Sequence, residues 1–197
     1  HALTYDTRDS RLIPTEGFIA RLNNDFAGLG GSVRFLRNEL GAEQFYPITD
    51  EFIVSVSGRA GHILGIGQDV EITDRFFLGG DSLRGFQTAG AGPRDRLTKD
   101  SLGGEWRYNG SVQMRMPLGL PNEFGLSGRV FSDFGSLGSV TPSDVNTFDT
   151  ASVRASVGFG VGWNSPFGPV NVDFGFPVLK EDLDETELIR LNFGTRF

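Results

Sequence analysis

The sequence predicts an all-β protein that forms part of a transmembrane antiparallel β-barrel. Three observations predict this fold class: apolar residues alternate with polar ones in segment after segment, Gly occurs 28 times, and Phe dominates the aromatic residues at 18. Uninterrupted apolar runs are only a few residues long, whereas a helix needs roughly 20 apolar residues to cross a bilayer. The sequence therefore excludes a helical membrane protein.

About nine strands are expected in order along the chain. The alternation is clearest in 153–164, where Val157 and Phe159 fall on one face and small or polar residues fall on the other. A strand with one apolar face and one small or polar face fits between lipid and water. The expected strands are, roughly, 1–9, 16–29, 31–47, 51–66, 106–116, 124–137, 153–164, 170–176 and 187–197.

The connections between these strands are of two kinds. Outer-membrane barrels place short turns on the periplasmic side and longer loops outside, so all long loops are expected at one end of the sheet. Compact connections are expected at 11–17, 47–50, 118–123 and 164–168, and outer ones at 28–31, 67–102, 137–151 and 178–187.

A soluble β-sandwich is the alternative, because its strands also alternate. The predicted outward faces carry Trp, Tyr and Phe, while the inner faces carry Arg, Asn and Asp. For example, Tyr108 falls on the outward face and its neighbours Arg107 and Asn109 fall on the inner face. A packed soluble core would bury the charged face at a large desolvation cost. The pattern therefore favours the membrane barrel.

Composition and motifs favour a non-enzymatic protein without a cofactor or metal. Cys is absent, which excludes disulfides, zinc–thiolate sites and a Cys nucleophile. Neither His1 nor His62 has a triad setting, and no Gly-x-Ser-x-Gly motif is present. The acidic stretch 181–185 lacks the spaced ligands of a calcium loop and is expected to be solvated. A formal charge of −7 disfavours nucleic acid as a partner.

The segment 75–86, RFFLGGDSLRGF, closely resembles the loop motif of the BamA superfamily of outer-membrane proteins. The likeness continues in the strand segment 130–135, VFSDFG, and in the turn 165–169, SPFGP. Further matches in the same order are 5–9, 14–18, 92–95, 102–104 and 117–121. The resemblance therefore spans nearly the whole chain.

This resemblance implies a domain assignment. In the family a sixteen-stranded barrel follows periplasmic POTRA domains, and here five predicted strands follow 67–102. Residues 1–197 are then the C-terminal portion of the barrel, and the N-terminal strands and POTRA domains lie outside this chain. An odd strand count with an open edge at His1 agrees, because bacterial single-chain barrels have an even number of strands and no free edge in lipid.

The resemblance also implies a site at the tip of the long loop, which folds back into the lumen. Arg84 is expected to pair with Asp133, while Gly85 allows close backbone approach and Phe86 packs against the wall. On spacing alone, an exposed turn Arg without a partner is the simpler interpretation, and the resemblance favours the pair. The loop motif comprises Ser82, Leu83, Arg84, Gly85 and Phe86.

The anchoring partners are expected on two strands. Phe131, Asp133 and Gly135 belong to the strand motif. Relatives often place a second acidic residue where this chain has Gln113, so the resemblance implies a weaker or differently shared anchor. Arg115, on the same face, is expected to alter the network further.

The last expected strand resembles the recognition strand of outer-membrane proteins. Such a strand is bound by edge pairing, and in the family it borders the seam with the first strand. A purely lipid-facing role for Phe197 is also compatible, and Gly194 is expected to weaken pairing at the seam. The seam residues are Ile189, Leu191, Phe193, Gly194 and Phe197.

The function implied by the resemblance is a non-enzymatic insertase that folds nascent outer-membrane proteins into the bilayer. Its expected location is the bacterial outer membrane, and its expected partners are outer-membrane lipids, nascent β-barrels and accessory assembly lipoproteins. A related barrel that acts in autotransporter assembly or secretes a protein through its lumen is the main alternative. A passive diffusion porin is a third, which the long loop carrying Arg84 disfavours.

Overall fold

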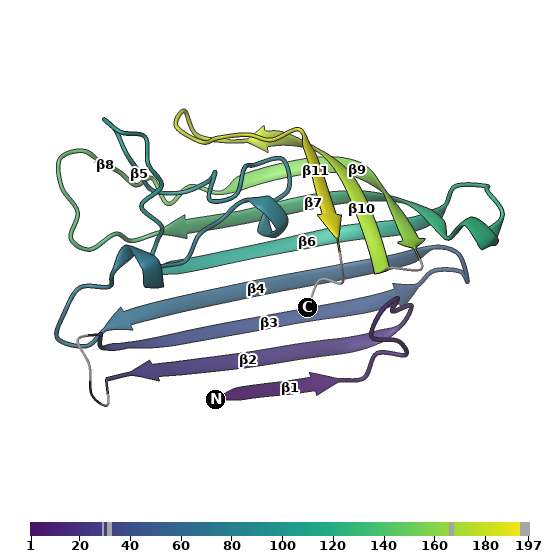
Figure 1. Ribbon diagram of the computed structural model, residues 1–197, viewed down its shortest axis with the longest axis horizontal. Helices are drawn as coiled ribbons and strands as arrows, with labels where there is room; N and C mark the ends of the chain where they lie inside the picture. The colour runs from purple at the N-terminus through teal and green to yellow at the C-terminus, as the bar shows by residue number, and fades with distance from the viewer. Residues whose placement is uncertain (29, 31–32, 166–167, 194–197) are drawn as a thin grey trace.

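The computed structural model describes residues 1–28, 30, 33–165 and 168–193. In this part of the chain nine strands form one antiparallel sheet whose order follows the sequence (Figure 1). This confirms the predicted all-β class and the predicted number of strands. The strands are β1 (Ala2–Asp6), β2 (Gly17–Ala27), β3 (Phe35–Pro47), β4 (Ile53–Gly65), β6 (Trp106–Pro117), β7 (Leu126–Gly138), β9 (Arg154–Ser165), β10 (Gly168–Leu179) and β11 (Ile189–Phe193).

The two ends of the sheet differ as the loop lengths predict. Figure 1 shows compact turns at one end and the long connections gathered at the other. Two long loops are joined there by a small sheet of β5 (Arg94–Asp95) and β8 (Thr147–Phe148), which the sequence did not indicate. Short 3₁₀ turns complete the connections: η1 (Ile72–Asp74), η2 (Gly80–Ser82) and η3 (Asn122–Phe124). Among the described residues, no helix has the length and apolar character to cross a membrane.

Strand bounds differ from the expected ones where side chains form turns. The first strand ends at Asp6, not Asp9, because Asp9 accepts hydrogen bonds from the hydroxyl of Thr15 and from the backbone N–H groups of Thr15 and Glu16. These bonds, with that of the Thr15 hydroxyl first, lower the pKa of Asp9 to about 2. The last strand begins at Ile189, and the expected positions Gly194 and Phe197 lie outside the described residues.

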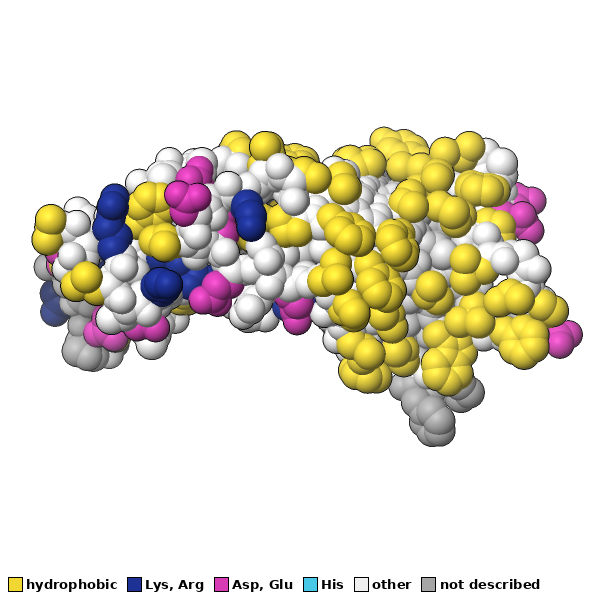
Figure 2. Space-filling view, turned by 90° about the horizontal axis from the view of Figure 1, so that it is seen from above, with side chains coloured by type: hydrophobic (Ala, Val, Ile, Leu, Met, Phe, Trp, Pro, Cys, Tyr) yellow, Lys and Arg dark blue, Asp and Glu magenta, His cyan; other side chains and the backbone are white. Residues whose placement is uncertain are grey.

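The two faces of the sheet have the predicted character. On β9, Val157, Phe159 and Trp163 are exposed on the outward face, whereas Arg154 and Ser156 are buried on the inward face. Figure 2 shows hydrophobic side chains gathered over one end of the viewed surface and charged ones concentrated toward the loop end. An apolar outer surface beside a polar inner one is the arrangement that a lipid-exposed strand requires.

The hydrophobic core lies between the inner face and the loop that connects β4 to β6, residues 66–105, here called the motif loop. Most of its members come from this loop, because the apolar side chains of the strands point outward, away from the loop. The buried cluster consists of Ile63, Val70, Phe76, Leu78, Leu83, Phe86, Ala91 and Leu137. The motif loop therefore packs on the inner face of the wall.

Replacement of an outward residue by a charge tests which face meets lipid. Val161→Arg on β9 is expected to lower the free energy of unfolding by about 2–4 kcal/mol, because an Arg near the bilayer centre is costly to desolvate. Urea unfolding of the protein in liposomes measures this change. Val145→Arg, in an exposed loop position, is the control and should change little. A similarly small effect at both positions would contradict a lipid-facing β9.

Candidate functional site at the motif loop

Arg84 lies in the motif loop, two residues after the end of η2. The η2 turn is closed by Ser82, whose hydroxyl donates to the carbonyl oxygen of Gly79 at 2.8 Å. This places Leu83 in the hydrophobic cluster and turns Arg84 toward the strands. Arg84 is 1% exposed, so the simpler interpretation of an exposed turn residue is wrong.

The Arg84 guanidinium is held by Asp133 of β7. Its Nε donates to Oδ2 and its Nη2 to Oδ1, both at 2.7 Å, so the pair is bidentate. The Arg84 backbone N–H donates to the same carboxylate at 3.2 Å, and the Ser111 hydroxyl donates at 2.6 Å. Because both charges are buried, each needs the partners that the other supplies. The pairing expected from the resemblance is thus present.

Neighbouring residues of the strand motif shape the site around this pair. The Arg84 guanidinium carbon lies 3.4 Å from the centre of the Phe131 ring, which adds a cation–π contact. Gly135 leaves room for the loop, since a Cβ there would meet Leu78 Cδ1 at 3.2 Å. Phe131 therefore contacts the guanidinium, and Gly135 lets the loop approach the strand closely.

Gly85 and Phe86 occupy the positions that the motif predicts. Gly85 has φ +91° and approaches β10 closely, because a Cβ would lie 3.2 Å from the carbonyl carbon of Gly175. Only Gly adopts this conformation at so close a contact without strain. Phe86 is fully buried in the cluster between loop and wall.

Gln113 shares in the anchor, which is one of the two forms that the resemblance implied. Its side-chain oxygen accepts from Arg84 Nη1 at 2.8 Å, so a neutral amide takes part in holding the guanidinium. Arg115 does not join the network: it donates to the carbonyl oxygen of Pro14 at 3.1 Å. The expectation that Arg115 alters the Arg84 network is therefore wrong, because its side chain reaches the turn between β1 and β2.

The second carboxylate of the site comes from β10. Asp173 is buried, lies 4.0 Å from Arg84 Nη1, and accepts from Arg129 Nε at 2.6 Å. Opposite it in the sheet is Gly160, which has no side chain to occupy the space. The alternation along 170–176 puts Asp173 on the polar face of its strand but gives no sign that it approaches Arg84. Charge at the site is thus shared by two Arg and two Asp residues.

The acidic connection between β10 and β11, residues 180–188 and here called the last loop, is partly buried. Asp184 accepts from Arg154 Nε at 3.1 Å, and both side chains are 1% exposed. Glu185 accepts from Arg94 Nη1 at 3.0 Å. The prediction that 181–185 is simply solvated is therefore wrong, because the last loop folds against the motif loop.

β11 is an edge strand within the described part of the chain, where it pairs with β10 alone. Its side chains Ile189, Leu191 and Phe193 are exposed on the outward face. Arg190 and Asn192 point inward, as the alternation predicts. The described seam residues thus lie on one face of an open edge.

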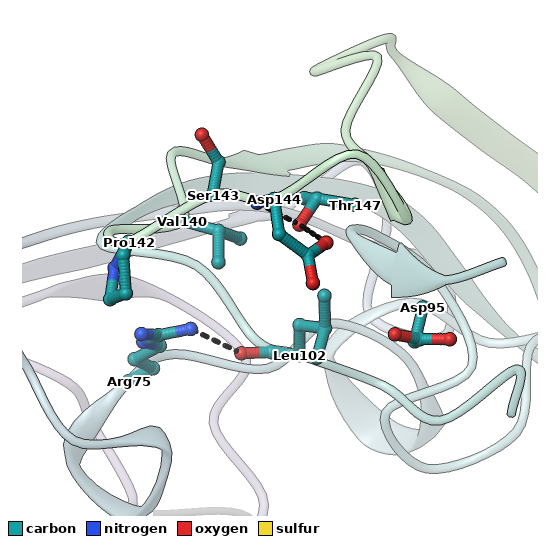
Figure 3. A pocket seen from close by; sticks show the side chains of 8 residues that line it. All are labelled: Arg75, Asp95, Leu102, Val140, Pro142, Ser143, Asp144 and Thr147. Atoms are coloured by element: carbon teal, nitrogen blue, oxygen red, sulfur yellow. Dashed lines mark hydrogen bonds between the residues drawn. The ribbon is translucent and has the colours of Figure 1, made fainter. Parts of the chain in front are cut away.

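A cavity of about 200 Å³ lies apart from Arg84, between the motif loop and the β7–β9 loop (Figure 3). Arg75 lines it, but its guanidinium already donates to the carbonyl oxygens of Val70, Leu102 and Thr141. The N–H groups of Thr98 and Leu97 hold the pKa of Asp95 below its ordinary value. In the described part of the chain, no group of three or more His, Asp or Glu side chains is placed to hold a metal.

A sheet with an apolar outer face, a polar inner face and a loop anchored by buried charges is typical of an outer-membrane β-barrel protein. The chain matches the Omp85 superfamily domain over residues 1–197. It therefore belongs to the Omp85 superfamily.

Individual relatives are similar in sequence over most of the chain. The outer membrane protein assembly factor BamA of Neorickettsia risticii is 35% identical over all of this chain and 27% of its own length. The SAM50-like protein of Schizosaccharomyces pombe is 30% identical over 93% of this chain and 41% of its own length. The crystal structure of Haemophilus ducreyi BamA lacking POTRA domains 1–3 superposes with a TM-score of 0.86 at 21% identity, over 96% of this chain and 40% of that one. The chain thus spans about a quarter of the length of the first relative.

A conservative change tests whether the bidentate geometry anchors the loop. Arg84→Lys keeps the charge but cannot make the forked contact, so docking of the loop should weaken by about 2–4 kcal/mol. The chain has no Cys, so a single Leu83→Cys change reports loop opening through its rate of maleimide labelling. The control Arg8→Lys changes a forked pair with Asp6 in the connection between β1 and β2 and should leave labelling nearly unchanged. Equal labelling in both variants would contradict the assignment.

Proposed function

We propose that the chain is the C-terminal, barrel-forming part of an outer-membrane assembly factor that inserts nascent β-barrels into the bilayer without enzymatic chemistry. The observation that carries this proposal is the buried Arg84–Asp133 anchor, which fixes the motif loop on the inner face. It is supported by relatives named as assembly factors that match the chain along nearly its whole length.

The domain arrangement is part of the same proposal. β1 and β11 are the two edges of the described sheet, and open edges are not tolerated in lipid. Further strands outside this chain would complete a sixteen-stranded barrel, preceded by POTRA domains. Accessory assembly lipoproteins are proposed as partners of that whole protein.

Edge pairing is the proposed mechanism of insertion. An edge strand offers unpaired N–H and C=O groups to an incoming strand, while alternate side chains give selectivity. On β11 the outward residues Ile189, Leu191 and Phe193 would face lipid beside the incoming strand of the nascent barrel, here called the client strand. Their contact with outer-membrane lipid would let a client strand exchange water for lipid and for backbone hydrogen bonds in one step.

The packed motif loop favours this function over a passive pore. Leu83, Phe86 and Leu137 are fully buried between loop and wall, so this part of the inner face is covered and not open to solutes. A barrel that secretes protein through its lumen would have to undock Arg84. Secretion is therefore an alternative outcome of the following experiment.

Folding of a reporter outer-membrane barrel into liposomes tests the proposal. The full-length parent should accelerate folding, and Arg84→Ala should remove about tenfold or more of that acceleration, because Asp133 is left buried without its main partner. Lys99→Ala, in the same loop but away from the strands, is the control. A well-folded parent without any effect on the reporter would overturn the proposal and favour secretion.

A further inference from the structure

The motif loop and the last loop pair through their backbones. Phe86 and Thr186 form an antiparallel bridge, flanked by hydrogen bonds from Glu187 N to Gly85 O and from Gln87 N to Glu185 O, both at 3.0 Å. Glu185 N also donates to Gly90 O at 2.8 Å. The residues that follow Arg84 therefore form a short ladder with the residues that precede β11.

A buried ion pair fixes the last loop to the wall beside this ladder. Asp184 accepts from Arg154 of β9 and also from the backbone N–H of Glu181 at 2.8 Å. The N–H of Gly92, in the motif loop, donates to the same carboxylate at 3.4 Å. Asp184 thus joins three segments: β9, the last loop and the motif loop.

Two further arginines connect the loops. Arg94, 3% exposed, donates to Glu185 and to the carbonyl oxygens of Ala89 and Lys99, so it holds its own loop together while it reaches the last loop. Arg190, the second residue of β11, pairs with Glu187 and lies 3.6 Å from Asp81 of η2. Charged contacts therefore continue from the motif loop into β11 itself.

These contacts matter because β11 has few others. In the described residues it pairs only with β10, over five residues. The start of β11 is also held by the last loop, which is hydrogen-bonded to Gly85 and pairs with Phe86. Arg84 binds β7 while the next two residues bind the segment before β11, so consecutive residues join the wall to the edge strand.

We propose that Arg154 and Arg94 are positioning residues that, through Asp184 and Glu185, make the docking of Arg84 set the position of β11. The consequence for insertion rests on the proposed function, but the coupling itself does not. The groups that face this junction are Arg84, Arg94, Arg154 and Arg190 with Asp81, Asp184, Glu185 and Glu187.

Hydrogen exchange of the full-length parent in liposomes tests the coupling. Asp184→Asn keeps the shape of the side chain and removes its charge, and should raise exchange of the amides in 185–193 by about tenfold or more. The amides of 130–134 on β7 should be unchanged, because the Arg84–Asp133 pair is intact. Arg94→Met is a second variant, milder because Glu185 is half exposed, and should raise the same amides by about threefold.

The matched control is Glu39→Gln, a part-exposed carboxylate that binds Arg37 and Arg107 away from the last loop. It should leave exchange in 185–193 unchanged. Arg84→Ala should raise exchange in both 84–87 and 185–193. Unchanged amides of 185–193 in Arg84→Ala, or in Asp184→Asn and Arg94→Met together, would overturn the coupling.

Reporter folding separates this inference from the proposed function. Asp184→Asn should slow reporter folding by about threefold or more while the parent and Glu39→Gln remain active. If β11 exchange rises but folding keeps its rate, the positioning role in insertion is overturned and the proposed function stands. If the parent itself does not accelerate folding, the proposed function fails, and the exchange result still decides the coupling.

Discussion

The buried contact between Arg84 and Asp133 is the constraint on which the rest of the structure depends. A guanidinium placed against the inner wall would be strongly unfavourable without a carboxylate, and Asp133 meets it with two parallel hydrogen bonds. Replacing a buried ion pair by apolar residues of similar volume often leaves stability unchanged, but here it would remove the directional contact that sets the register of the loop. The pair therefore specifies where the loop lies more than it stabilises the wall. The apolar cluster around Leu83 and Phe86 then supplies the bulk of the packing.

Small residues on the inner face make this docking possible. Gly158 stands opposite Phe131 in the sheet, and a Cβ there would clash with the Phe131 ring that supports Arg84. Gly160 gives Asp173 the space to reach Arg129. The alternation of apolar with small residues along β9 thus serves two environments: large side chains contact lipid, and Gly leaves volume for polar side chains from neighbouring strands. The glycines of β9 therefore affect both the packing of the wall and the docking of the loop.

Much of the fold could be predicted from the sequence because strand alternation is a local signal, and the nine strands follow one another in order. The site was harder to predict from the sequence. Arg84 and Asp133 are 49 residues apart, so only the family resemblance indicated their contact. Asp173 and Asp184 were not identified as ion-pair partners, since an acidic residue on a strand or loop carries no mark of the Arg that folding brings beside it. The β5–β8 sheet was missed because two-residue strands have no periodicity.

The sheet order has a consequence for the order in which contacts arise. Each strand pairs with the next long strand along the chain, so the wall can grow hairpin by hairpin at small cost in loop-closure entropy. Arg84, by contrast, contacts side chains of β6, β7 and β10 and has its full set of partners only when all three strands are in place in the sheet. Its burial therefore requires a correctly ordered wall, because a wall with a misplaced strand leaves the guanidinium without its full set of partners.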